Sequence, residues 1–238
     1  MPPAAVAPSP SRSDRLDALR GVAMVWMAAF HFSFDLNHFG WIKQDFYRDP
    51  VWTWQRTAIV SLFLFCAGGG QALALLNGQA AGRFWKRWGW VAACALLVSV
   101  GSWFMFSRSW ISFGVLHGIA VMLVLLRFGL ARLPNGVLLV IAAVAFAAPH
   151  FVQHAAFDTR WTNWIGLVTQ KPVTEDYVPV LPWLGAILIG LVITRARPQF
   201  WQGSAPRLLA ALGRWPLSFY MVHQPVLIGV LMGLQQFR

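Results

Sequence analysis

Long charge-free apolar runs, separated by short segments with charged residues, dominate the sequence after residue 13. A helix that crosses the hydrocarbon core of a bilayer needs about 17–25 apolar residues, and most of the runs reach this length. The first run is shorter and needs residues on either side of it to span. The pattern predicts about seven transmembrane helices, over Gly21–Phe34, Thr57–Gly82, Trp88–Ser107, Ser109–Leu126, Leu133–Phe157, Tyr177–Thr194 and Trp215–Phe237.

The composition supports a membrane protein without a soluble module. Of 238 residues, 58% are hydrophobic and 11% are charged, whereas a soluble domain carries about 25% charged residues. We therefore predict an all-α fold, a polytopic integral membrane helical bundle that forms one domain over residues 14–238. Residues 1–13 are rich in Pro, Ala and Ser, a composition that predicts a disordered tail.

The formal net charge of +11 is unevenly distributed between the predicted spans. With a cytoplasmic N-terminus, the inner segments hold 12 of the 19 Lys and Arg residues and the outer segments hold 7. This asymmetry follows the positive-inside rule, so we predict that the N-terminus is cytoplasmic. A basic inner face suits anionic lipid or a phosphorylated cytosolic ligand. The lipid bilayer is therefore the expected partner, and nucleic acid is not.

One face of the first predicted helix carries ionisable residues through the apolar run. Arg20 and His31 are eleven residues apart, close to three helical turns, and so lie on one face about 16 Å apart along the axis. Asp17 and Asp35 continue this face, and Asp35 follows His31 by four, so the carboxylate and the imidazole can touch. Because ionisable groups at membrane depth are costly, such a face indicates a functional site.

Further polar residues fall in the outer half of the predicted bundle. His117 and His223 lie inside spans, and Asp176 and Tyr177 enter from an outer loop. These four residues are candidate substrate contacts. For His117 and His223, an equally good interpretation is a hydrogen bond to a neighbouring helix. A zinc site needs three or four ligands, and His150 with His154 offers two, so we predict no metal.

Proton abstraction from an acceptor suits this arrangement. A buried imidazole stays neutral and can accept a proton, and a carboxylate beside it would orient the ring and stabilise the imidazolium. His31 is therefore the candidate general base and Asp35 its orienter. Arg20, with Asp17 near it, is placed to contact the phosphate of a cosubstrate from the cytosol, because arginine matches phosphate geometry.

Several blocks resemble the catalytic domain of the heparan-alpha-glucosaminide N-acetyltransferase family, in its short bacterial form. They are RLDALRGVAM, FHFSFDL, ISFGVLHGIA, DYVPVLPWLG and LGRWPLSFYMVHQPVLIG, and together they cover the chain after Asp14. Arg20, ten residues and then His31 is also similar to the signature of the acyltransferase type 3 proteins, which belong to the same transmembrane acyltransferase group.

The resemblance implies an acyl-CoA donor, usually acetyl-CoA, and an amine or hydroxyl acceptor, often on a carbohydrate, on the far side of the membrane. It implies a bacterial inner membrane location and leaves a homo-oligomer open. His31 and Arg20 match the signature residues. The lysosomal enzyme of the family is longer, and its catalytic histidine follows the point that matches His31. His38 is therefore a rival for the base.

Two other functions fit the same residues. A proton-coupled transporter would use His31 and Asp35 as a proton relay, although only the last predicted span has an internal proline, at Pro225, beside a buried histidine. A catalytically silent membrane subunit would bind no CoA and move no protons. For an acyltransferase, direct transfer and an acyl-histidine intermediate both remain open, and ping-pong kinetics would indicate the intermediate.

Overall fold

The computed structural model describes residues 13–237. Within this range the chain is all-helical and has no strand, as predicted. The α-helices are α1 (Asp14–His38), α2 (Pro50–Leu76), α3 (Ala81–Met105), α4 (Val115–Phe128), α5 (Asn135–Phe151), α6 (Val180–Ala196), α7 (Arg207–Gly213) and α8 (Pro216–Gln235). Four short 3-10 helices are η1 (Leu130–Arg132), η2 (Ala155–Phe157), η3 (Asn163–Ile165) and η4 (Pro198–Trp201).

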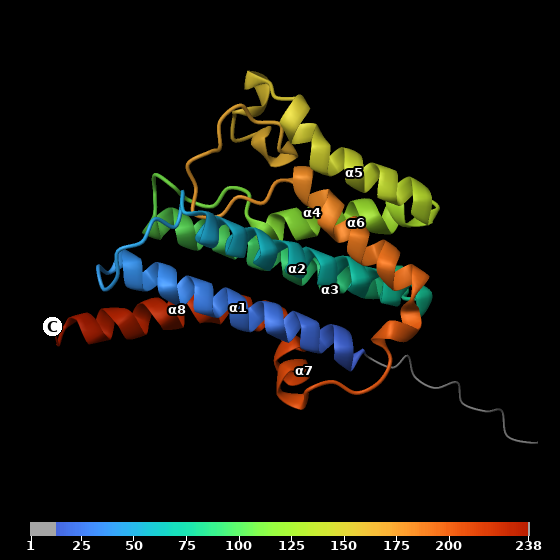
Figure 1. Cartoon of the computed structure of the whole chain (residues 1–238), viewed down its shortest axis with the longest axis horizontal. Helices are drawn as coiled ribbons and strands as arrows, with labels where there is room; N and C mark the ends of the chain where they lie inside the picture. Colours follow the sequence, from blue (N-terminus) through green and yellow to red (C-terminus); the bar gives the residue numbers. More distant parts are fainter. Residues whose placement is uncertain (1–12, 238) are drawn as a thin grey trace, which may run out of the picture.

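α1, α2, α3 and α8 run roughly along the long axis of the molecule, and α5 and α6 are inclined to it (Figure 1). α1 packs against α2, α7 and α8, and α6 packs between α2 and α5. α1 and α8 form one edge of the bundle and α5 the opposite edge (Figure 1). We name the two ends of the bundle after the ends of α1. The Asp14 end holds the α2–α3 connection, and the His38 end holds the long loop 152–179.

Side-chain caps and a proline define where the first two helices begin. The Ser13 hydroxyl accepts a hydrogen bond from the backbone N–H of Leu16 at 3.1 Å and donates one to the carbonyl of Trp201 at 2.7 Å. The Asp49 carboxylate caps α2 at the N–H of Val51, with Pro50 in the first turn. Such caps satisfy N–H groups that have no partner inside the helix. The predicted disordered tail lies outside the described residues apart from Ser13, which caps α1.

Glycines allow the backbones of α2 and α6 to pack in close contact. A β-carbon at Gly68 would lie 1.9 Å from the carbonyl oxygen of Ile187, and one at Gly190 would lie 2.1 Å from that of Phe65. No side chain fits at these distances, so the two backbones touch directly. Close approach through small residues is the usual way that membrane helices pack.

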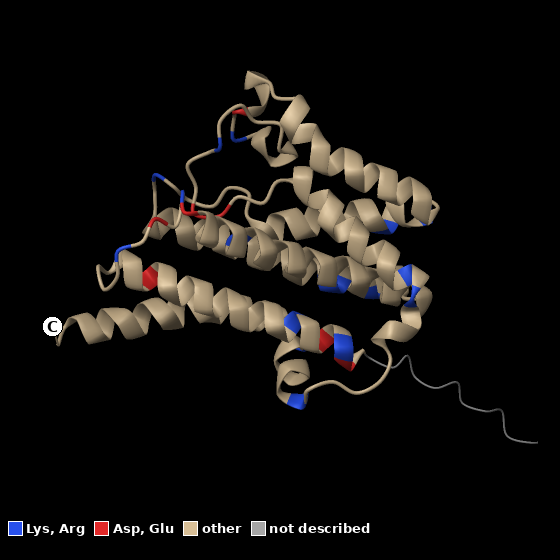
Figure 2. Ribbon diagram, viewed as in Figure 1, with Lys and Arg blue, Asp and Glu red and all other residues tan. Residues whose placement is uncertain are grey.

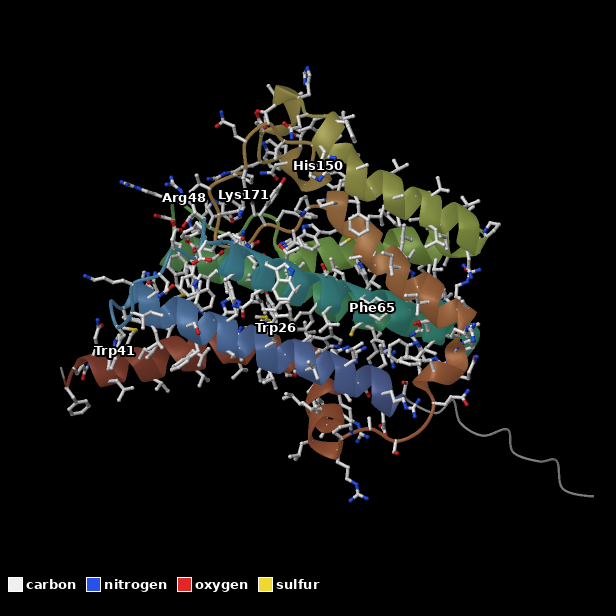
Figure 3. All side chains as sticks on the ribbon, viewed as in Figure 1. Trp26, Trp41, Arg48, Phe65, His150 and Lys171 are labelled. Carbon is white, nitrogen blue, oxygen red and sulfur yellow. The ribbon has the colours of Figure 1, made fainter. Side chains whose placement is uncertain are left out.

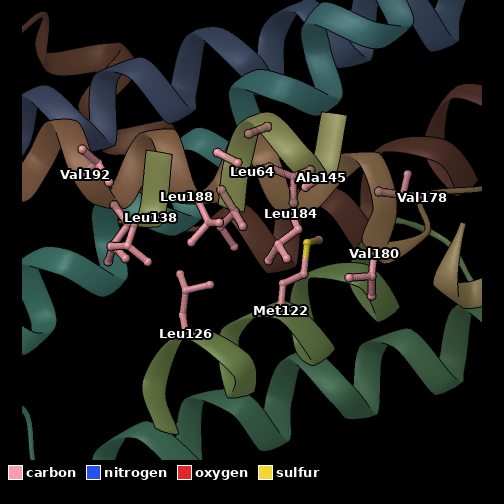
Figure 4. Packing of buried hydrophobic residues seen from close by; sticks show 14 of the residues in the cluster. Leu64, Met122, Leu126, Leu138, Ala145, Val178, Val180, Leu184, Leu188 and Val192 are labelled. Carbon is pink, nitrogen blue, oxygen red and sulfur yellow. The ribbon is translucent and has the colours of Figure 1, made fainter. Parts of the chain in front are cut away.

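The main core lies where α2, α4, α5 and α6 meet. Leu64, Met122, Leu126, Leu138 and Leu188 are fully buried there, and Figure 4 shows their side chains meeting from four helices. A second, aromatic cluster of Phe30, Phe46 and Trp52 holds the loop after α1 against its last turns, with the rings of Phe46 and Trp52 stacked at 4.1 Å. This cluster fixes the loop beside the outer part of α1.

Among the described residues 13–237, four helices are long and apolar enough to cross a membrane: α2, α3, α4 extended to Arg132, and α8. α5 and α6 are apolar but have 17 residues each. Their exposed side chains are largely apolar, as expected of an integral membrane protein. The count of seven spans and the cytoplasmic N-terminus stay predictions.

All seven predicted spans differ in extent from the helices. The predicted span Thr57–Gly82 starts inside α2 and runs past the end of α2 at Leu76 into α3, which begins at Ala81. The predicted span Ser109–Leu126 begins as a helix only at Val115, because residues 109–113 pair with the loop before α6. Leu133–Phe157 gives a helix that ends at Phe151, and Tyr177–Thr194 gives one that begins at Val180. The connection 195–214, predicted as a loop, contains α7, whose Gly213 packs on the backbone of α1. Boundaries set by such contacts carry no signal in hydropathy.

Figure 2 shows most of the acidic residues toward the His38 end of the bundle and basic residues at both ends. Arg15 and Arg20 lie in the first turns of α1, and Arg195 lies in the last turn of α6, all at the Asp14 end. Asp35 lies in the last turn of α1, at the His38 end. The two ends therefore offer different surroundings to a charged ligand.

Candidate active site

His31 of α1 lies against His223 of α8. Their ring centroids are 5.2 Å apart and the rings meet edge to face. Phe30 packs beside His31, and the ring of Phe219 is stacked on His223 at 5.7 Å. Two imidazoles separated by 192 positions in the chain therefore share one apolar site between α1 and α8.

The hydrogen bonds of His223 define which of its nitrogens is free. Nδ1 lies 2.7 Å from the carbonyl oxygen of Tyr220. Because a carbonyl oxygen only accepts, Nδ1 carries the proton and donates it. Nε2 of the neutral ring then holds a lone pair, and it is buried with no hydrogen-bond partner. An unpaired buried nitrogen is costly unless a ligand or a proton fills its place.

Asp35 does not form the predicted hydrogen bond to His31. Its Oδ1 accepts a hydrogen bond from Nε2 of Gln224 at 2.8 Å, and its Oδ2 is buried with no partner. The side chain of Asp35 points toward α8 one turn beyond His31, so both residues still line the α1–α8 interface. The sequence pattern did not single out Gln224, because only ionisable residues inside spans were candidates. A Gln in an apolar span is a comparable indication of a polar site.

His38, the rival base, lies at the end of α1. It is exposed, and its ring contacts Phe39 at 5.4 Å. Seven residues separate it from His31, about 10 Å along the helix axis. The structure therefore places His38 at the surface and His31 in the interior of the bundle.

His117 closes the first turn of α4. The backbone N–H of Gly114 donates to its Nδ1 at 3.3 Å, and its Nε2 lies 3.1 Å from the hydroxyl of Ser99. That hydroxyl donates its proton to the carbonyl of Ile111 at 2.7 Å, so His117 Nε2 is the donor to Ser99. Both ring nitrogens are thus used in joining α3 to α4, which favours a structural role.

Asp176 and Tyr177 hold the loop before α6 in place. Asp176 accepts a hydrogen bond from the backbone N–H of Val115 at 2.7 Å, which caps α4. The Tyr177 hydroxyl donates to the carbonyl of Asn163 at 2.7 Å, and burial raises the pKa of Tyr177 to about 12. No hydrogen bond joins these residues or His117 to the His31–His223 pair in the described part of the chain.

Because of the raised pKa of Asp176, the protein should become less stable to unfolding as the pH rises. Burial raises the pKa of the Asp176 carboxyl, although the hydrogen bond from Val115 and the charges of Lys171 and Arg56 oppose this. Between the ordinary and the raised pKa the folded state binds more protons than the unfolded state, so the free energy of unfolding decreases as the pH rises through that window. Thermal unfolding of Asp176→Asn, which keeps a capping oxygen, should show a shallower slope than wild type. Equal slopes would contradict this.

At the Asp14 end, Arg20 makes contacts within the protein. Its Nη1 donates to Oδ1 of Asp17 at 2.6 Å and to the carbonyl of Gly213 at 3.1 Å. The guanidinium of Arg20 also lies beside Gly70, where a β-carbon would be 3.5 Å from Nη2. Arg20 and Asp17, which were predicted to contact the phosphate of a cosubstrate, therefore join α1 to α7 and adjoin α2.

A cavity of about 170 Å³ lies between α2, α3 and α4 and has Gly70 in its wall. Gln71, Gln79 and Arg87 contribute its polar lining. Gln71 is 6% exposed, and its Nε2 has no hydrogen-bond partner, nor does Oε1 of Gln79. Because buried polar atoms normally find partners, these amides suit a polar ligand that enters at this end.

A second cavity, of about 490 Å³, opens at the His38 end. The loop after α1 lines it, from Asn37 to Tyr47, with Lys43 and Asp45 as the charged side chains. Arg48 and Lys171 lie in neighbouring loops at this end of the molecule (Figure 3). These two cavities therefore lie at opposite ends of the bundle, and the histidine pair lies between α1 and α8.

These features define an all-helical integral membrane protein with an ionisable site inside its bundle. Residues 12–225 match the family model described as Heparan-alpha-glucosaminide N-acetyltransferase, catalytic. The match covers nearly the whole chain, and the protein belongs to this family of acetyltransferase-type enzymes, as the sequence blocks indicated. No curated protein and no solved structure matches the chain.

Proposed function

We propose that this protein is a transmembrane acyltransferase of a bacterial inner membrane. It moves an acetyl or other acyl group from cytosolic acyl-CoA to an amine or hydroxyl of an extracytoplasmic acceptor such as a sugar. The observation that carries this proposal is the His31–His223 pair, enclosed by apolar helices in a chain of this family. Ionisable pairs at such depth serve chemistry or transport far more often than packing.

The Asp14 end supports binding of the donor. Its cavity is lined by Gln71, whose amide nitrogen has no partner, by Gln79, whose amide oxygen has none, and by Arg87. Arg20 lies against Gly70 in the cavity wall. A volume of about 170 Å³ is below the ~300 Å³ of a typical ligand pocket, so it suits one part of acyl-CoA rather than the whole cosubstrate. The guanidinium groups of Arg20 and Arg87 match the geometry of the CoA phosphates.

The transfer needs a base at the acceptor. In the proposed reaction His31 removes a proton from the acceptor N–H or O–H as the nitrogen or oxygen attacks the thioester carbonyl. The carbon–sulfur bond breaks, the acyl group stays on the acceptor, and the CoA thiolate takes up a proton. His223, with its free Nε2 lone pair, lies next to His31 and can receive the proton from it.

The His38 end supports entry of the acceptor. The cavity there is lined by polar and charged side chains of the loop after α1. Phe46 from this loop packs edge to face on Phe30, which neighbours His31 in the sequence. A carbohydrate that occupies the cavity would approach the histidine pair along α1.

Acetyl-CoA should stabilise the detergent-purified protein against thermal unfolding. A ligand at about 100 times its dissociation constant adds roughly 2.7 kcal/mol to the free energy of unfolding. Arg87→Ala should weaken this stabilisation because Arg87 lines the cavity. Arg83→Ala, four residues earlier on α3 and outside the cavity lining, is the matched control and should respond like wild type. Arg20→Ala should also weaken it.

The same measurement can contradict the proposal. If acetyl-CoA and longer acyl-CoA donors at millimolar concentration leave the unfolding temperature unchanged, the donor site is wrong. Proton uptake into proteoliposomes that depends on His31 would then favour a proton-coupled transporter. A protein that neither binds CoA nor moves protons would be a silent subunit.

A further inference from the structure

Gln224 of α8 reaches across the helix interface to Asp35 of α1. Its Nε2 donates to Oδ1 of Asp35 at 2.8 Å, between residues 189 positions apart. Asp35 is 4% exposed. Asp35 occupies the turn after His31, and Gln224 follows His223 directly, so this hydrogen bond lies beside the histidine pair.

The hydrogen bond fixes the direction of both side chains. With its amide N–H used on Asp35, Gln224 turns Oε1 away from Oδ1, and Oε1 is buried without a partner. Asp35 likewise keeps Oδ2 buried and free. With Nε2 of His223, three hydrogen-bond acceptors without protein partners line the same part of the α1–α8 interface. If the amide were reversed, two acceptor oxygens would face each other.

We propose that Gln224 is a positioning residue for acyl transfer, and this rests on the proposed function. Its hydrogen bond holds the Asp35 carboxylate against α8 and leaves Oδ2 buried without a protein partner, in the α1–α8 interface that also holds the histidine pair. Without this bond, the Asp35 carboxylate can rotate toward His38, three residues further on the same helix. Gln224 therefore acts through Asp35 and does not itself touch the reacting atoms.

The test compares two replacements of Gln224 that keep its length. Gln224→Met removes the donor, and Gln224→Glu replaces it with a second carboxyl that can donate only when the two carboxyls share a proton. Gln235→Glu, an exposed position on the same helix, is the control. The assay follows release of the CoA thiol from acetyl-CoA, with a set of amino sugars and neutral sugars as acceptors, from about pH 5 to about pH 8.

Gln224→Met should lower kcat roughly 10- to 100-fold at every pH, the effect of a misplaced reacting group. Its KM for acetyl-CoA should stay the same because the donor cavity is at the other end. Gln224→Glu should be impaired at pH 8 and recover toward pH 5. His31 and His38 of α1 and His223 of α8 also face this position. Because they are present in wild type and in every variant, they cannot explain a pH dependence that only Gln224→Glu shows. Residues 95–105 of α3, which also packs on α8, contain no titratable side chain.

Each outcome is decisive. A wild-type kcat in Gln224→Met, or the same loss in Gln224→Glu at every pH, would overturn the positioning role and leave the proposed function standing. A wild-type protein that releases no CoA thiol with any acceptor would overturn the proposed function and this inference together. If Gln224→Glu regains kcat at low pH and Gln235→Glu keeps the wild-type kcat at every pH, both the positioning role of Gln224 and the proposed function are supported.

Discussion

Replacing His31 with alanine is expected to abolish acyl transfer while binding of acetyl-CoA persists. Loss of a general base typically lowers the rate by about 10²- to 10⁴-fold. The donor cavity adjoins Arg20, about 16 Å from His31 along α1, so the thermal stabilisation by acetyl-CoA should match that of wild type. The two measurements on one purified variant separate the chemical step from donor binding.

His38→Ala is the matched control for this experiment. His38 lies on the same helix but is exposed at its end, and we expect this variant to keep the wild-type rate. Full activity in His31→Ala together with a large loss in His38→Ala would move the base to His38. It would also mean that the loop after α1 is rearranged during the reaction, because His38 now lies at the surface.

Replacing Gly68 with valine is expected to prevent α2 and α6 from packing. The first added carbon would lie 1.9 Å from the carbonyl oxygen of Ile187, a backbone atom that cannot move without shifting α6. Overpacking usually costs about 1–3 kcal/mol and more where the backbone is displaced. We expect loss of the folded species, measured by size-exclusion chromatography and by the midpoint of thermal unfolding.

Gly89→Val controls for the valine itself. Gly89 lies in the middle of α3, where an added β-carbon would meet no atom within 4 Å. This variant carries the same change in helix propensity without the contact, and should purify and unfold like wild type. If Gly68→Val is as stable as Gly89→Val, the close contact between α2 and α6 does not determine the fold.

The sequence alone determined the membrane class, the presence of most of the helices and the family. Apolar length and charge content are local properties of the chain, so they indicated integral membrane helices without knowledge of any contact. Helical period placed His31 and Asp35 on one face of α1. The sequence blocks identified the family that the match over residues 12–225 confirmed.

Only the tertiary structure decided which polar groups meet. His31 and His223 come together because α8 packs against α1, a pairing between residues 192 positions apart that no local pattern encodes. The same packing gives Asp35 a partner in Gln224 instead of the imidazole four residues before it. His117 and Asp176 were candidate substrate contacts, yet their hydrogen bonds join α4 to its neighbours. A polar residue in an apolar helix requires a hydrogen-bond partner, and the packing of the whole bundle decides which residue that partner is.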